Sequence, residues 1–530
     1  MADRELLLGD EAVALAAIHA GISGAYSYPG TPATELFEFI EGKAEAAHVY
    51  ARWSANEKVA YEEALGMSLA GKRTIVSMKH VGLNVAADAF VNSGVTGVNG
   101  GLVVCVADDP GMHSSQNEQD SRYYAKFALI PCLEPHDQQE AYDMTRYAFE
   151  LSEQQHVPVM VRLVTRLAHS RADVVTAPAH PQNPLKRAAD PMQFTLLPSN
   201  ARILYKKLTD KQPALLAGAE SSPFNTLDLS GADRSRGVIA NGIAINYLRE
   251  AFGGKVPFPV LKIGHSPIPA GLVLKLVDAV KEVVVVEEGY PLIEEALRGI
   301  AGIAGKTIRG KLDGTLPRTG ELNPNIVAAA FGVDTAKLLA PTLATLPSRP
   351  PTLCPGCGHT DTFALLKEAV APYGNQRLFG DIGCYTLGFY PPHDAIGSCV
   401  DMGASISMAA GAAHAGEFPV MCAIGDSTFA HSGMTPLLTA ARHNVNFNVI
   451  ILDNGTVAMT GTQETLATGE DLDRIVAGLG VAKGHVHVFN PIKSKWDENL
   501  KLIRAEIEYQ GTSVLIARRP CVQAKRRGVV

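Results

Sequence analysis

The sequence is poor in cysteine and in long apolar runs. Eight cysteines in 530 residues are too few for a disulfide-built scaffold, so a cluster of them would indicate metal or redox chemistry. The longest apolar runs, such as 283-VVVV-286 and 102-LVVCVA-107, fall far short of the roughly 18 residues that a membrane span needs. The N-terminus is acidic within five residues and lacks the pattern of a signal peptide, which predicts a cytoplasmic protein.

The sequence also lacks an excess of positive charge. Its formal net charge is −7, and no basic stripe appears before the short stretch 525-KRRG-528, which we interpret as a solvated C-terminus. A nucleic-acid surface is therefore not expected. The composition, 46% apolar and 19% charged, is that of a folded protein, and the length predicts about three or four domains.

Short apolar, β-branched runs alternate with helical periodicity along the chain, which predicts an α/β fold with doubly wound parallel sheets. The runs are nearly continuous in apolar character, as expected for strands covered by helices on both faces. They are 74-TIVSM-78, 102-LVVCVA-107, 157-VPVMVRL-163, 237-GVIAN-241, 283-VVVVEE-288, 419-PVMCAIGD-426 and 447-FNVIILDN-454.

Two stretches rich in proline predict linkers, because proline fixes its own φ and pushes the preceding residue towards extended geometry. They lie at 177–199 and at 341–353. These linkers divide the chain into three expected α/β domains, which are residues 1–185, 200–340 and 350–530.

The third domain contains the most specific local pattern, a βαβ unit with polar residues where its strands end. Asp426 follows the first strand and Asn454 follows the second. Parallel strands of such a unit are neighbours or nearly so, and open α/β sheets bind ligands at the carboxyl ends of their strands. A carboxylate and an amide oxygen form a partial Mg²⁺ site that phosphate oxygens can complete. Gly425 would let the backbone approach a diphosphate closely.

A pair of cysteines, in 354-CPGCGH-359, has three possible roles. Structural zinc usually needs a second Cys or His pair, and none follows in this domain. A thioredoxin-like disulfide expects the motif at a helix start after a strand, whereas this one follows a linker. Thiolates collected from scattered loops can instead hold an iron–sulfur cluster. Local spacing does not decide between these roles of Cys354 and Cys357.

The βαβ pattern resembles the thiamine diphosphate motif, a Gly-Asp-Gly followed at a similar distance by Asn-Asn. Here Gly425-Asp426-Ser427 precedes Asp453-Asn454 by 25 residues. The pattern departs from the motif at Ser427 and Asp453, but both metal-binding positions are kept. The resemblance implies Mg²⁺ bound by Asp426, Asn454 and the backbone carbonyl of Thr456.

Thiamine enzymes also need a carboxylate that hydrogen-bonds the aminopyrimidine ring. Glu57, near the start of a helix in the first domain, is a candidate, whereas Glu62 and Glu63 have the pattern of a solvated face. Because a single helical glutamate most often lies at the surface, the assignment depends on a wider resemblance.

That resemblance extends over residues 5 to 525. The chain resembles the α subunits of indolepyruvate:ferredoxin oxidoreductase, a branch of the thiamine-dependent 2-oxoacid:ferredoxin oxidoreductases. The segments that carry the resemblance are 28-YPGTPATEL-36, 56-NEKVA-60, 77-SMKHVGLNVAAD-88, 107-ADDPGMHSSQNEQDSR-122, 354-CPGCGH-359, 401-DMGASI-406 and 458-AMTG-461.

The family's domain order would be a pyrimidine-binding domain, a transketolase-C-terminal-like domain and a diphosphate-binding domain. Glu57 matches its pyrimidine-contacting glutamate, and Thr31 matches a threonine that contacts the substrate carboxylate. Lys79 and His80, expected on a loop after a strand, are candidate substrate contacts. Cofactor contacts are expected at Gly425, Asp426, Ser427, Asn454, Thr456, Met459 and Thr460.

The resemblance also assigns the cysteines. Related diphosphate-binding domains use a C-x-x-C, a third cysteine at a spacing like that of Cys384, and a fourth far downstream. We therefore predict one 4Fe-4S cluster on Cys354, Cys357, Cys384 and Cys521, with Cys399 as the competitor for the fourth position. The other three are expected to be core residues: Cys105, Cys132 and Cys422.

The implied activity is oxidative decarboxylation of an aryl 2-oxoacid, of the indolepyruvate or phenylpyruvate type, to its acyl-CoA. Members of this branch usually carry a C-terminal ferredoxin-like domain, and no such cysteine run occurs before Val530. Electrons are then expected to leave to ferredoxin or to a partner subunit with clusters or flavin. A small γ-type partner subunit and a dimer of heterodimers are expected. The alternatives are a non-redox thiamine decarboxylase and an oxidoreductase for arylglyoxylate or branched 2-oxoacids that uses NAD.

Overall fold

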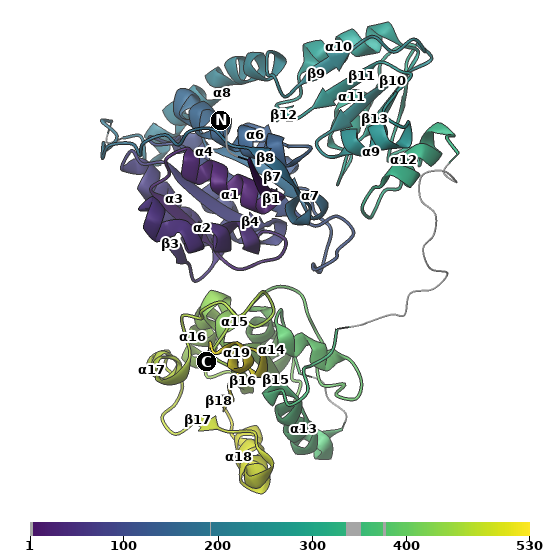
Figure 1. Cartoon of the computed structure of the whole chain (residues 1–530). Helices are drawn as coiled ribbons and strands as arrows, with labels where there is room; N and C mark the ends of the chain where they lie inside the picture. Colours follow the sequence, from purple (N-terminus) through teal and green to yellow (C-terminus); the bar gives the residue numbers. More distant parts are fainter. Residues whose placement is uncertain (1–3, 191, 335–350, 375–377, 530) are drawn as a thin grey trace. The chain divides into compact units, whose positions relative to one another are not determined.

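A computed structural model describes residues 4–190, 192–334, 351–374 and 378–529. The described chain forms two compact units, residues 1–344 and 345–530. Each is built on mostly parallel sheets covered by helices, which confirms the α/β fold class (Figure 1). Within these residues, none of the helices has the length and apolar character that crossing a bilayer requires.

The first unit begins with a seven-stranded sheet whose order is β12-β6-β7-β5-β4-β2-β3. Every neighbouring pair is parallel except β12 with β6. The strands are β2 (Gly24–Ser27), β3 (Tyr50–Trp53), β4 (Thr74–Lys79), β5 (Leu102–Asp108), β6 (Cys132–Leu133), β7 (Val159–Val164) and β12 (His265–Ser266). A separate antiparallel ribbon joins β1 (Arg4–Leu8) and β8 (Arg171–Val175).

Helices cover both faces of this sheet, which is why its central strands are buried along their whole length. One face is covered by α1 (Gly9–His19), α2 (Thr34–Ala47), α6 (Gln138–Gln155) and α7 (Thr165–His169). The other is covered by α3 (Glu57–Leu69), α4 (His80–Thr96), α5 (Arg122–Ala128) and α8 (Pro198–Glu220).

A second sheet of the first unit has the order β14-β13-β10-β11-β9, with only β9 antiparallel. Its strands are β9 (Thr226–Asp228), β10 (Arg236–Asn241), β11 (Val260–Ile263), β13 (Glu282–Val286) and β14 (Thr307–Arg309). Its helices are α9 (Ala244–Ala251), α10 (Ala270–Ala279), α11 (Leu292–Arg298) and α12 (Pro324–Phe331).

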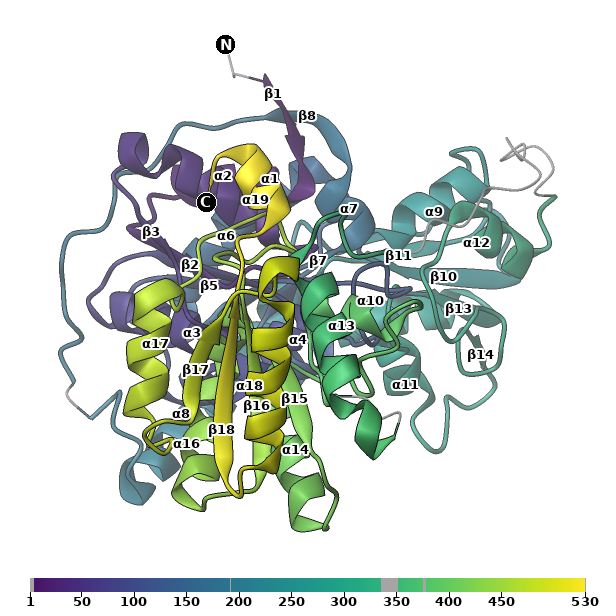
Figure 2. The ribbon, with the colours of Figure 1, turned by 90° about the horizontal axis from the view of Figure 1, so that it is seen from below.

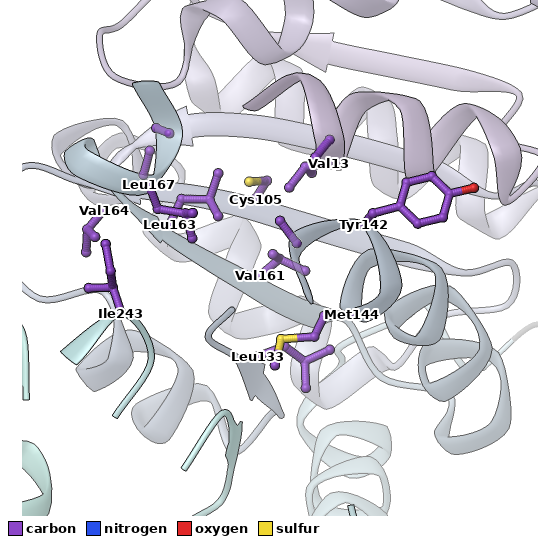
Figure 3. Packing of buried hydrophobic residues seen from close by; sticks show 14 of the residues in the cluster. Val13, Cys105, Leu133, Tyr142, Met144, Val161, Leu163, Val164, Leu167 and Ile243 are labelled. Atoms are coloured by element: carbon purple, nitrogen blue, oxygen red, sulfur yellow. The ribbon is translucent and has the colours of Figure 1, made fainter. Parts of the chain in front are cut away.

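The two sheets of the first unit share one apolar cluster. Figure 3 shows part of it, with Val13 and Met144 near strand residues such as Val161, and Ile243 of the second sheet's layer beside Val164. The strand β12 also comes from the second half of the unit but pairs with β6 of the first sheet. The unit is therefore continuous across the expected boundary between its first two domains, and that boundary stays a prediction.

A buried charge network joins the same two sheets. Arg122 donates to Glu287 at 2.8 Å and to Asn241 at 2.9 Å, and its guanidinium also pairs with Asp120. Arg162 donates to Asp108 at 2.6 Å and to Glu134 at 2.8 Å. Because a buried charge is costly unless it is paired, each arginine depends on carboxylates from elsewhere in the unit.

Of the two expected linkers, the structure describes the first but little of the second. Residues 176–190 form no regular element, but they pack along the first unit: the amide of His180 donates to His19 O at 2.7 Å and that of Lys186 to Ala70 O at 2.9 Å. The segment thus extends along the surface of the first unit, and α8 begins only at Pro198. The second expected linker, 341–353, lies largely outside the described residues.

The second unit has a four-stranded parallel sheet with the order β15-β16-β18-β17 (Figure 2). The strands are β15 (Met421–Gly425), β16 (Phe447–Asp453), β17 (Val486–Phe489) and β18 (Thr512–Arg518). Helices α13 (Gly358–Val370) and α18 (Trp496–Glu508) cover one face. The other face is covered by α14 (Ala404–His414), α16 (Met434–Arg442) and α17 (Gly469–Gly478).

Candidate active site

In the second unit, the two predicted metal-binding residues lie side by side. Strands β15 and β16 are parallel neighbours with Gly425 in register with Leu452, so Asp426 and Asn454 follow adjacent strand ends. The carboxylate of Asp426 accepts the amide of Ser427 at 2.8 Å through one oxygen and the amide of Gly455 at 2.8 Å through the other. The βαβ topology thus places both side chains at the carboxyl edge of the sheet.

Burial, together with the nearby carboxylate of Asp453, raises the pKa of Asp426 to about 8, against the lowering effect of backbone amides. Asp453 itself is directed to other partners. It accepts Nε of Arg518 at 2.6 Å and the amide of Gly469 at 3.1 Å. This explains the departure from the thiamine motif at Asp453, since its charge is used in a local ion pair.

The loop after Asn454 is organised by its own hydrogen bonds. Oδ1 of Asn454 accepts the amide of Thr456 at 3.0 Å, and the hydroxyl of Thr456 donates to Gln463 O at 2.8 Å. The hydroxyl of Thr460 donates to Oε1 of Gln463 at 2.7 Å, whereas Met459 is half exposed. Oγ of Ser427 is buried and has no hydrogen-bond partner within the described residues.

Four of the five candidate cysteines are gathered in the second unit. Cys357 caps α13, the amide of Cys357 donates to Cys354 O at 3.0 Å, and Cys521 precedes the short helix α19 (Val522–Arg527). Cys384 begins a 3₁₀ turn, Cys384–Phe389. Burial, together with the nearby thiols of Cys357, Cys521 and Cys354, raises the pKa of the Cys384 thiol to about 12.

Cys399 stands apart from this group. It is exposed, and the groups that influence the pKa of its thiol are Thr386 and Asp381, after burial, rather than the other cysteines. No three of the four gathered sulfurs, all of them in the described part of the chain, lie within 4.8 Å of one another. Thiolates around one tetrahedral zinc would be about 3.8 Å apart at the usual Zn–S length. The gathered sulfurs are thus spaced more widely than in a preformed tetrahedral zinc site.

A backbone hydrogen bond ties the cysteine group to the metal-binding loop. The amide of Cys521 donates to the carbonyl of Asn454 at 2.9 Å. The amide of Arg519, two residues earlier, donates to Asp453 O at 3.0 Å, which extends the pairing of β18 with β16.

In the first unit, Glu57 is the first residue of α3 and is buried, with 5% of its surface exposed. Its neighbour Asn56 caps the helix by accepting the amide of Val59 at 2.9 Å. Gly82 on α4 makes room for the carboxylate, because a Cβ there would lie 2.6 Å from Oε1 of Glu57. The glutamate is therefore not the surface residue that its helical position alone would suggest.

The structure corrects the expected position of Lys79 and His80. No loop separates them: Lys79 is the last residue of β4 and His80 is the first of α4. The stem of Lys79 lies against the turn that contains Thr31, since a Cβ at Gly30 would be 3.2 Å from Cγ and Cδ of Lys79. The sequence showed a strand followed by a helix but gave no sign that they are directly joined.

His80 is almost fully buried, and burial lowers its pKa, so the imidazole is neutral at pH 7. Its Nε2 donates to Oδ1 of Asn117 at 3.2 Å. Its Nδ1 is buried and has no hydrogen-bond partner within the described residues. A neutral imidazole in this tautomer offers Nδ1 as an acceptor.

A loop between β5 and α5, residues 109–118, folds towards the turn that contains Thr31. Asp109 accepts the amide of Ser114 at 2.8 Å and the hydroxyl of Thr165 at 2.7 Å. Ser114 in turn donates its hydroxyl to Thr31 O at 3.2 Å. The segment was part of the family resemblance, but no local motif marks which of its polar residues fold towards Thr31.

The remaining cysteines are core residues, as predicted. Cys105, Cys132 and Cys422 are buried within β5, β6 and β15.

Two family models match the chain. Residues 15–213 match "Pyruvate flavodoxin/ferredoxin oxidoreductase, thiamine diP-bdg". Residues 381–516 match "Thiamine pyrophosphate enzyme, C-terminal TPP binding domain". The first match contains Glu57, Thr31 and Lys79, and the second contains Asp426 and Asn454.

Curated relatives match over nearly the whole chain. The indolepyruvate oxidoreductase subunit IorA of Methanothermobacter thermautotrophicus is 39% identical over 98% of this chain and 87% of its own length. The subunit of the same name from Archaeoglobus fulgidus is 38% identical over 99% of this chain and 88% of its own length.

Among solved structures, the 2-oxoglutarate:ferredoxin oxidoreductase of Magnetococcus marinus has a similar fold. The TM-score is 0.53 at 16% identity, and the likeness covers 62% of this chain and 65% of the other. At that sequence identity, the similarity supports the fold alone.

The fold, the two thiamine-binding regions and the relatives define a thiamine diphosphate-dependent 2-oxoacid oxidoreductase of the 2-oxoacid:ferredoxin class. Within this class, the chain belongs to the family of indolepyruvate oxidoreductase α subunits.

Proposed function

We propose that the chain catalyses the coenzyme A-dependent oxidative decarboxylation of an aryl 2-oxoacid of the indolepyruvate or phenylpyruvate type. Electrons would pass through one 4Fe-4S cluster to ferredoxin or to a partner subunit. The single observation that carries the redox part is the hydrogen bond from Cys521 to Asn454, because it holds four gathered cysteines next to the metal-binding loop. The aryl substrate rests on the names of the curated relatives.

The residues of the second unit fit Mg²⁺ and a diphosphate. Asp426, Asn454 and the carbonyl of Thr456 offer the oxygen ligands that Mg²⁺ prefers. A buried carboxylate whose pKa is raised to about 8 favours a nearby cation, which would hold it ionised. The unpartnered hydroxyl of Ser427 and the backbone at Gly425 suit phosphate oxygens, and Met459 and Thr460 remain proposed cofactor contacts.

The gathered cysteines fit a 4Fe-4S cluster better than zinc, because thiolates at this spacing need a larger inorganic core between them. We assign Cys354, Cys357, Cys384 and Cys521 as its ligands. Close, partly buried thiols resist ionisation, as the raised pKa of Cys384 indicates, and the positive charge of an iron–sulfur core would offset that resistance.

The residues of the first unit have distinct proposed roles. Thiamine diphosphate, when bound, supplies the nucleophilic carbon that attacks the 2-oxo carbonyl. Glu57, buried at the start of α3, holds a proton at the ring nitrogen of the aminopyrimidine. Thr31 contacts the substrate carboxylate, and the unpartnered Nδ1 of His80 accepts a hydrogen bond from the substrate.

The test is an anaerobic assay of the chain co-purified with its proposed γ-type partner. Phenylpyruvate and indolepyruvate are compared with arylglyoxylate and branched 2-oxoacids, with ferredoxin and NAD as alternative acceptors and with or without coenzyme A. Acceptor reduction that depends on coenzyme A and is fastest with the aryl substrates supports the proposal. Aldehyde release without acceptor reduction, in a sample lacking the brown absorbance of iron–sulfur centres, would instead support a non-redox decarboxylase.

A further inference from the structure

A lysine in the first unit, Lys79, is half-buried and, in the described part of the chain, has no counter-charge in contact. Burial lowers the pKa of Lys79 to about 8, against the opposing influence of Asp109 and Glu57. Among the described residues, Lys79 forms no ion pair within 4.0 Å, in contrast to Arg122, which reaches three carboxylates. A partly buried ammonium loses hydration without gaining an ion pair, which favours the binding of an anion beside it.

The position of the ammonium is fixed by two contacts. Nζ of Lys79 donates to Ser114 O at 2.9 Å, and the hydroxyl of the same serine donates to Thr31 O at 3.2 Å. The lysine stem lies along Gly30. Ser114 therefore holds the ammonium beside the turn that presents Thr31. An ammonium has three donors, and this arrangement uses one of them on the protein.

The nearest carboxylate is already occupied. Asp109 accepts the amide of Ser114 at 2.8 Å, the hydroxyl of Ser115 at 2.7 Å and the hydroxyl of Thr165 at 2.7 Å. These bonds hold Asp109 between its own loop and α7, so it positions Ser114 and favours the charged form of Lys79 without contacting it. The free donors of the ammonium are left for another anion.

We propose that Lys79 binds the carboxylate of the 2-oxoacid substrate, next to Thr31. This inference rests on the proposed function, and it identifies the residue that distinguishes a 2-oxoacid from an aldehyde. The carboxylate that Lys79 contacts leaves as neutral CO₂ when the bond between C1 and C2 breaks, and the electron pair of that bond stays on C2. Lys79 therefore stabilises bound substrate more than the transition state, and its loss affects KM more than kcat.

The experiment compares three variants in the co-purified complex. Lys79→Met removes the charge at similar volume, and Lys79→Arg keeps it. Lys126→Met, at an exposed lysine of α5, is the matched control. The substrates are phenylpyruvate and phenylacetaldehyde. The aldehyde lacks the carboxylate but can give the same acyl-CoA, with coenzyme A supplying the thiol and the acceptor taking two electrons. Thiamine affinity and iron content report whether each variant is intact.

We expect Lys79→Met to raise the KM for phenylpyruvate about 100-fold, the effect of losing a charge-assisted contact, with a much smaller change in kcat. The KM for phenylacetaldehyde should change less than about threefold by the same reasoning. Lys126→Met should match the wild type on both substrates. An unchanged KM for phenylpyruvate, or an equal loss on both substrates, would overturn the inference.

The pH profile gives a second readout. The ammonium must be protonated to bind the carboxylate, so kcat/KM for phenylpyruvate should fall as pH rises through about 8 in the wild type. In Lys79→Arg, the fall in kcat/KM for phenylpyruvate should move to higher pH. The kcat/KM for phenylacetaldehyde should show no such fall. The other titratable groups near Lys79 are Glu57, Asp109 and His80, and none of them changes in the arginine variant. A fall at the same pH in Lys79→Arg would contradict the assignment.

Calorimetry on the thiamine-free complex separates this inference from the proposed function. Phenylpyruvate should bind the wild type and Lys79→Arg but not Lys79→Met. If the wild type bound phenylpyruvate through Lys79 without oxidising it, the proposed function would fail and the binding role of Lys79 would stand. If the wild type oxidised phenylpyruvate and Lys79→Met bound it equally well, the binding role would fail and the proposed function would stand.

Discussion

The backbone amide of Cys521 donates a 2.9 Å hydrogen bond to the carbonyl of Asn454. One residue belongs to the gathered cysteines, and the other is a proposed ligand of the diphosphate-bound metal. The bond lies just beyond the paired ends of β16 and β18, so the core of the sheet fixes both segments. Two predicted sites that lie 67 residues apart in the sequence are thus held by one element of structure.

The first prediction concerns the fourth cluster ligand. Cys521→Ser should lose most of the iron and acid-labile sulfide, because a hydroxyl is a poor ligand for iron in such a cluster. Cys399→Ser, at the exposed cysteine outside the group, should retain both. Iron and sulfide per chain, measured after anaerobic purification, check this. If Cys521→Ser kept its full iron content and Cys399→Ser lost iron, Cys399 and not Cys521 would be the fourth cluster ligand.

Glu57 gives the second prediction. Glu57→Gln should lower kcat by about 10²–10⁴-fold, the usual contribution of a positioned proton-transfer group. The iron content should not change, because Glu57 lies in the first unit and the cysteines lie in the second. Glu62→Gln is the control, since Glu62 is exposed on the same helix and pairs with Lys58. Turnover in Glu57→Gln at the wild-type rate would refute the role.

The third prediction tests the buried charge network. Arg122→Met removes the closest cation from the buried carboxylates of Asp120 and Glu287, so the free energy of unfolding of the first unit should fall by about 3–5 kcal/mol. Urea unfolding followed by tyrosine and tryptophan fluorescence measures it. Arg474→Met, at an exposed pair with Asp471 in the second unit, should change little. An unchanged midpoint in Arg122→Met would show that the network contributes little.

Asp10 gives a prediction about pH. Burial raises the pKa of this carboxyl well above its usual value, and the neighbouring Glu35 raises it further. Neither oxygen of Asp10 has a hydrogen-bond partner within the described residues beyond the weak influence of the Leu36 amide. A group whose pKa is raised by folding stabilises the fold fully below its unfolded pKa, about 4, and less as pH rises towards the folded value.

Asp10→Asn cannot ionise, so its melting temperature should exceed that of the wild type by more at pH 8 than at pH 5. Differential scanning calorimetry at both pH values measures this. Asp210→Asn, at an exposed aspartate of α8, should show no such trend. A difference between Asp10→Asn and wild type that stays constant with pH would mean that Asp10 keeps the same protonation state throughout that range.

The sequence allowed the local geometry of the second unit to be predicted for a simple reason. Asp426 and Asn454 each end an apolar strand of one βαβ unit, and parallel pairing brings such ends together without further information. The gathering of Cys384 and Cys521 was expected only from the family resemblance. No local pattern separates Cys521 from Cys399, because their distances from the other sulfurs depend on how the loops fold back on the sheet.

The first unit was harder to predict. The contacts of Lys79 with Ser114, and of Arg122 with Glu287, join residues that lie on different elements and share no spacing rule. Hydrophobic periodicity predicts which elements form, but it carries no information on how polar side chains pair once the layers have packed. The same limit explains β12, a two-residue strand that is too short to be recognised in a sequence.

The arginine network also bears on how the chain folds while it is being synthesised. Arg122 leaves the ribosome well before Glu287 and Tyr290, whose carboxylate and carbonyl it contacts in the finished fold. At ordinary rates of translation that delay is about 10–30 s. During this interval the first sheet holds a guanidinium without its final partners and an edge at β6 that still awaits β12. The first sheet is therefore completed only when the second sheet emerges.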